Sequence, residues 1–94
     1  MKQTATRPAP ASILERVGRI MMLGIEITNL GRYHVFVNWS GHVNVISVHA
    51  HYAASADYSE KKANERFADI KARLNGDHAE IQLDNIITVM ESLR

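Results

Sequence analysis

Residues 33–56 read YHVFVNWSGHVNVISVHAHYAASA, and the stretch contains no Asp, Glu, Lys or Arg. Its only side chains that titrate near neutrality belong to four histidines, His34, His42, His49 and His51. Valine, isoleucine and aromatic residues alternate there with small polar ones, which is typical of β-strands. A sheet with so little fixed charge favours a packed or self-associating surface over a solvated one.

Two three-residue segments of the same form punctuate this region, Asn29-Leu30-Gly31 and Trp39-Ser40-Gly41. Each ends in the glycine that a hairpin turn with a left-handed third residue requires. With such turns Val37 lies opposite Val43, and the apolar residues of the strands share one face. The sequence therefore predicts a three-stranded antiparallel meander made of residues 25–28, 32–38 and 42–51.

The N-terminal part predicts a helix over residues 13–23. Ser12 and Glu15 fit a capping box, apolar residues follow at helical spacing, and Gly24 offers a stop. An alternative remains open, in which this helix continues to about Asn29 and leaves only a two-stranded hairpin.

The C-terminal third predicts two helices. The spacing of Ala63, Phe67, Ile70 and Leu74 indicates the first, over residues 58–74. A second capping pattern at Asp77 and Glu80, followed by apolar residues at helical spacing, indicates the last helix. A strand at residues 79–83 is the alternative for its beginning. The fold class is thus α+β, with one helix, the meander, and two C-terminal helices packed on one face of the sheet.

The 94 residues are enough for one small domain, which we expect at residues 12–94 after a flexible tail at residues 1–11. A net charge of +1 gives no strong field that would attract nucleic acid or an anionic membrane. No signal peptide or membrane span is recognisable, so we expect a cytoplasmic protein. The absence of a glycine-rich phosphate loop predicts no nucleotide cofactor, and we expect no other cofactor.

His49 and His51 are the candidate metal ligands, because residues two apart on a strand point to the same face. The predicted register puts His34 and His42 on the opposite face. A zinc site would then have to recruit Asp57, His78 or a second chain to reach three ligands. We therefore prefer to interpret His49 and His51 as half-buried residues bonded to neighbouring backbone.

The outer face of the predicted sheet is apolar where a solvated sheet would carry charges. The strand at residues 42–51 is predicted to be an edge, and it lacks the lysine, proline or inward charge that protects natural edges. We expect a homodimer through this edge or through the outer face, or contact with another protein. The candidate interaction residues are His34, Phe36, Trp39, Ile46, Val48 and Ala50.

Residues 33–44, YHVFVNWSGHVN, resemble a segment of small uncharacterised prophage-encoded proteins, in which an aromatic-Ser-Gly-His-Val turn joins two strands. The resemblance implies a bacterial or phage setting and carries over no activity. The sequence thus predicts a non-enzymatic interaction or self-associating module. The alternatives are a nucleic-acid-binding accessory protein, which the lack of a cationic groove disfavours, and a small metal-dependent or histidine-based enzyme.

Overall fold

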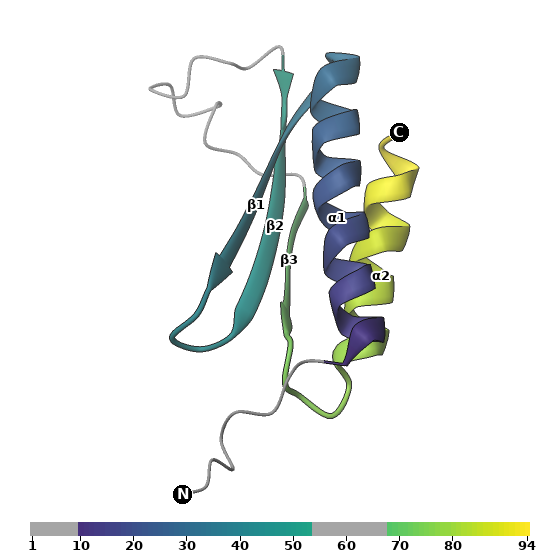
Figure 1. Cartoon of the computed structure of the whole chain (residues 1–94). Helices are drawn as coiled ribbons and strands as arrows, with labels where there is room; N and C mark the ends of the chain where they lie inside the picture. The colour runs from purple at the N-terminus through teal and green to yellow at the C-terminus, as the bar shows by residue number, and fades with distance from the viewer. Residues whose placement is uncertain (1–9, 54–67) are drawn as a thin grey trace, which may run out of the picture.

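Figure 1 shows the computed structural model of the chain, which describes residues 10–53 and 68–94. Its elements are, in order, helix α1 (Ala11–Leu30), strands β1 (Tyr33–Ser40), β2 (Val45–Tyr52) and β3 (Ala68–Arg73), and helix α2 (Ala79–Ser92). The strands form one antiparallel sheet in the order β1-β2-β3, and both helices lie on one face of it. The chain is therefore α+β with a three-stranded antiparallel sheet, as predicted, but the described residues form two helices instead of three.

Helix α1 is longer than predicted, and the strand expected at residues 25–28 is wrong. The helical spacing of fully buried residues continues across Gly24, from Ile20 and Leu23 to Ile27. One glycine costs a helix only about 1 kcal/mol relative to alanine, which the burial of further apolar side chains can offset. Gly24 therefore lies inside the helix and does not end it.

The two ends of α1 also differ from the capping pattern in the sequence. The N-cap residue is Pro10, so Ser12 lies inside the first turn and does not cap the helix. Gly31 ends the helix with a left-handed φ of 90°, and its N–H bonds to the Thr28 carbonyl at 3.1 Å. The alternative of a helix that continues to about Asn29 is confirmed, but the two-stranded hairpin that it implied is wrong, because β3 adds a third strand.

The pairing of β1 with β2 differs from the predicted register. Val37 lies opposite Val48 and not opposite Val43, because residues 41–44 form the turn in place of the expected Trp39-Ser40-Gly41. The shift between the two registers is an odd number of residues, so it exchanges the two faces of β2. The observed register buries the more apolar face of this strand beneath the helices, namely Ile46, Val48 and Ala50.

Strand β3 corrects two further predictions. It forms from part of the segment expected to be a helix at residues 58–74, of which residues 58–67 lie outside the described residues. Its alternation places Ile70 and Ala72 on the side of the core, a period of two that suits a strand. Because β3 pairs along β2, the segment 42–51 contains the central strand and not an edge.

Helix α2 begins close to the second predicted cap, and the alternative strand at residues 79–83 is wrong. Its buried face packs against α1 and β3. The core lies between the helix pair and the sheet, and its fully buried large side chains are Ile20, Leu23, Ile27, Ile46, Leu83, Ile86 and Met90.

Neither α1 nor α2, the helices of the described residues, combines the length and the apolar character that crossing a lipid bilayer would need.

Candidate interaction surface

Half of the predicted interaction residues lie in the core. Ile46, Val48 and Ala50 are buried beneath the helices, because the observed register turns them inward. His34 and Phe36 do lie on the outer face of the sheet, away from the helices. Trp39 lies at the end of β1 on the helix side, and 58% of it is exposed.

The same register brings together three histidines that the sequence assigned to opposite faces. His34 lies opposite His51, and Phe36 lies opposite His49, so all four side chains share the outer face. The ring of Phe36 stacks on that of His49 at 4.9 Å between centroids, and the rings of His49 and His51 meet edge to face at 5.3 Å. His42 lies apart from them, in the turn between β1 and β2.

This histidine cluster does not have the arrangement of a metal centre. Within residues 10–53 and 68–94, no three histidine or carboxylate side chains are placed to hold a metal ion together. His51 is only 6% exposed and packs against aromatic rings, which is how an imidazole in a packed surface behaves. Of the two residues of this chain that the predicted site could recruit, Asp57 lies outside the described residues and His78 is the N-cap residue of α2.

Strand β1, and not β2, is the uncharged edge of the sheet. Arg32 O accepts the N–H of Ala53 at 2.9 Å, which directs the backbone of even-numbered residues in β1 toward β2. The odd-numbered residues direct their N–H and C=O groups to the open side. Of these, the Val35 N–H donates to the Thr28 hydroxyl at 3.0 Å. The edge thus has pairing capacity at Val37 and Trp39.

The opposite edge of the described sheet has a different character. Strand β3 carries Asp69, Lys71 and Arg73 at alternate positions on the face turned away from the helices. Charged side chains on an edge strand oppose pairing with another chain. Of the two edges of the described sheet, only that of β1 therefore carries no charged residues.

Helix α1 divides its charged and apolar residues between two flanks. The charged flank meets α2, where Arg16 bonds Asp84 at 2.8 Å and Arg19 bonds Glu91 at 3.0 Å. The hydrogen bond that Arg16 donates to the Asp84 carboxylate raises the pKa of the guanidinium above its ordinary value. These pairs hold the two helices side by side and leave the other flank of α1 to apolar residues.

That other flank lies beside β1 and is exposed. Met21 is 47% and Ile25 56% exposed. A shallow groove separates them from Val35 and Val37 of β1. We call the open edge of β1 together with Met21 and Ile25 the β1–α1 surface; its side chains carry no charge.

The α1 half of this surface was missed at the sequence level. Leu14, Met21 and Ile25 recur at helical spacing, on a flank separate from that of the buried residues. A helix that ends at residue 23 does not include Ile25, so this second apolar stripe is not recognised. A helix that continues to about Asn29 includes it.

Comparisons of the chain with models of protein families, with curated proteins and with solved structures find no match for it.

Proposed function

We propose that the protein is a non-enzymatic, self-associating module, and that two copies join through the β1–α1 surface. The observation that carries the proposal is the uncharged edge of β1 beside the exposed apolar flank of α1. Large exposed apolar patches beside an open strand edge are typical of protein interfaces. Following the resemblance of residues 33–44 to prophage-encoded proteins, we assign the module to the bacterial cytoplasm.

A second copy suits this surface better than a charged partner does. A surface without charged side chains does not repel its own copy, and it offers a charged partner no complementary group. The charged edge at β3 disfavours continued strand addition, so pairing at β1 yields a closed dimer and not a fibre. Symmetric pairing of two β1 strands would also bring the two α1 flanks together on the same face.

The geometry of antiparallel pairing selects a register. Residues that face each other in an antiparallel pair project to the same side of the sheet, whereas successive residues of one strand project to opposite sides. One residue must therefore face its own copy, and the two-fold axis passes midway between the two. An axis at Asn38 sets Val37 opposite Trp39 of the second copy and uses the backbone groups of both. It also leaves the bond between Val35 and Thr28 intact. We therefore centre the dimer on Asn38.

Light scattering across a concentration series tests the self-association. The wild-type chain is expected to be a dimer, and Ile25→Lys a monomer with an unchanged circular dichroism spectrum, because a lysine there would be buried opposite its own copy. Ile81→Lys is the matched control, since Ile81 is 62% exposed on α2 and lies outside the β1–α1 surface. A wild-type monomer at all concentrations, or equal dissociation by both variants, would overturn the proposal.

Single cysteines test the register, because the chain contains no cysteine of its own. Asn38 and its copy would form a non-hydrogen-bonded pair with Cα atoms about 4.5 Å apart, within the range of disulfides. Asn38→Cys is expected to form a covalent dimer on mild oxidation, whereas Lys71→Cys on the opposite edge is expected to remain monomeric under denaturing conditions. A dimer that fails to cross-link at position 38 would refute the register but not the self-association.

A further inference from the structure

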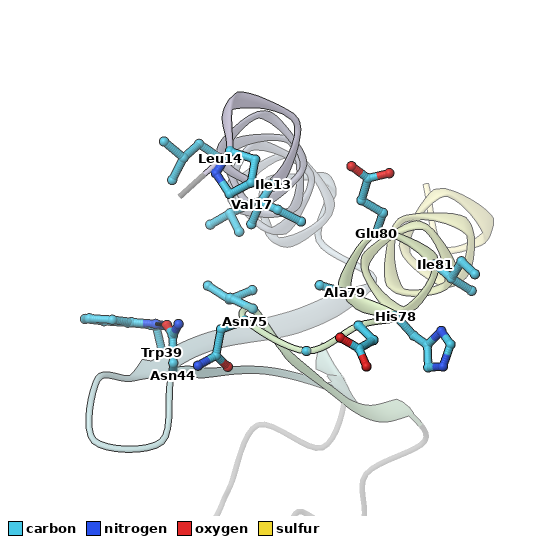
Figure 2. Close-up of a pocket in the computed structure, with 14 residues that line it drawn as sticks. Ile13, Leu14, Val17, Trp39, Asn44, Asn75, His78, Ala79, Glu80 and Ile81 are labelled. Atoms are coloured by element: carbon cyan, nitrogen blue, oxygen red, sulfur yellow. Dashed lines mark hydrogen bonds between the residues drawn. The ribbon is translucent and has the colours of Figure 1, made fainter. Parts of the chain in front are cut away.

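A cavity of about 830 Å³ opens at the end of the molecule where both helices begin. It lies between the N-terminal turns of α1, the turn between β1 and β2, and the loop that joins β3 to α2 (Figure 2). This volume is within the range of about 300–1,000 Å³ that is usual for small-molecule sites. Apolar side chains form much of its wall, namely Ile13, Leu14, Val17, Leu74 and Ala79.

Trp39 gives this cavity an aromatic wall whose orientation is fixed. Its indole Nε1–H donates to the side-chain Oδ1 of Asn44 at 3.0 Å. The backbone carbonyl of Asn44 accepts the N–H of Leu74 at 2.9 Å. On its other side the ring lies so close to Gly41 that a Cβ there would stand 3.0 Å from it. In Figure 2 the indole is seen edge-on, with the apolar side chains of Leu14 and Val17 across the cavity.

The ring of Trp39 is fixed in one orientation, which is unusual for an exposed side chain. An aromatic ring kept in place by a hydrogen bond and a close backbone contact, yet more than half exposed, is arranged to receive another flat group. Asn44 adopts a φ of 55°, a left-handed conformation that asparagine tolerates better than most residues. The turn thus takes up an uncommon backbone geometry that aims the amide at the indole.

The lining contains two carboxylates and no lysine or arginine. Asp77 and Glu80 are the two carboxylates, and the imidazole of His78 is the remaining ionisable group. Glu80 stands in the first turn of α2 and accepts a hydrogen bond from Ser12 at 2.6 Å, so its carboxylate already offsets the positive end of that helix. The carboxylate of Asp77 remains as the group that favours a positive charge.

We propose that this cavity binds a small organic cation with a flat apolar body. The body lies against the indole of Trp39, facing Leu14, and the positive charge is directed to Asp77, with Glu80 adding to the negative charge of the lining. An aromatic ring contributes to such binding by stacking and by its attraction for cations, and the carboxylates contribute charge complementarity. Trp39 belongs both to the cavity and to the β1–α1 surface, but every residue of the lining comes from one chain, so binding does not require self-association.

Trp39 supplies the measurement, because it is the only tryptophan of the chain. We would titrate the 15N-labelled protein with N-methylquinolinium and follow the indole N–H resonance, using naphthalene-1-sulfonate as an anion of similar shape. The cation is expected to shift the resonance to saturation with an affinity at least about tenfold above that of the anion. Equal affinities, or no saturable shift with the cation, would overturn the proposal.

Substitutions test separately the carboxylates, the position of the indole and the dependence of binding on self-association. The double variant Asp77→Asn, Glu80→Gln should reduce the preference for the cation to within about twofold, because the isosteric amides keep the shape of the cavity. Gly41→Ala should weaken binding of both probes, since its methyl group displaces the indole. Ile25→Lys should leave cation binding unchanged even where it abolishes self-association; loss of binding in that variant would count against the site.

Discussion

Gly24 of α1 lies directly over Val37 of β1: a Cβ at this glycine would stand 3.2 Å from Val37 Cγ2 and 3.4 Å from Val35 Cγ1. Gly18, six residues earlier, has no neighbouring atom within 4 Å of its Cβ position. The same residue type therefore has two roles in one helix. Gly24 allows the helix to approach the sheet, and Gly18 only lowers helix stability.

The two glycines form a matched pair for a stability measurement. Gly18→Ala is expected to raise the free energy of unfolding by about 0.5–1 kcal/mol, which is the helix-propensity gain over glycine. The free energy of unfolding of Gly24→Ala is expected to be roughly 1 kcal/mol lower than that of Gly18→Ala, because the added methyl group presses on two stiff valines. Urea denaturation, at a concentration where light scattering reports one species, gives both values. Equal gains would contradict the close approach.

The observed strand register makes a second prediction. Ile46 is buried in the core, whereas the neighbouring Val45 points to the outer face. Ile46→Ala should therefore lower the free energy of unfolding by about 2–5 kcal/mol. Val45→Ala should lower it by less than about 1 kcal/mol, since the side chain is only half-buried. The register with Val37 opposite Val43 predicts the reverse order, so chemical denaturation of the two variants discriminates between them.

The hydrogen bond between Trp39 and Asn44 is expected to restrict the indole in solution. Asn44→Ala removes the acceptor and places a residue with a Cβ but no polar group at a positive φ, so the fluorescence anisotropy of Trp39 should fall. Asn44→Asp is the control, because it keeps both an acceptor oxygen and tolerance of this backbone conformation. Equal anisotropy in the wild type and in Asn44→Ala would show that the bond does not hold the ring.

Charges on β3 are expected to keep association at the dimer stage. In Lys71→Thr, Arg73→Thr the β3 edge would lose its cationic side chains, so that both edges of the described sheet would lack them. Sedimentation velocity should then show species larger than a dimer, growing with concentration. Adding Ile25→Lys to this variant should remove the contact at β1 and limit growth; sedimentation unchanged by the threonines would contradict the role of β3.

The ion pair of Arg16 with Asp84 gives a prediction about pH. A pKa raised in the folded state stabilises the fold at every pH below the unfolded pKa, and this contribution is lost only as the pH rises through the folded value. Because a guanidinium titrates far above neutrality, the stability lost in Arg16→Gln should be constant between about pH 6 and pH 9. It should shrink in high salt, since the pair is exposed. Thermal unfolding measures both dependences.

Helix α2 and the strand character of the uncharged stretch could be predicted because both depend on local pattern. The spacing of Leu83, Ile86 and Met90 makes one apolar face in a helix, whatever lies beyond it. The end of α1 was harder to predict. Gly24 carries a local stop signal, and the contact with Val37 that makes glycine necessary there comes from a strand thirteen residues later.

The sequence alone determined the α+β class, the last helix, and the presence of an uncharged strand region with four histidines. It could not determine which face of β2 is buried, which strand is the edge, or that His34, His49 and His51 share a face. Those features follow from register and from the pairing of β3, which are set by contacts between distant segments. A shift by an odd number of residues changes no local propensity, yet it exchanges core and surface along the whole strand.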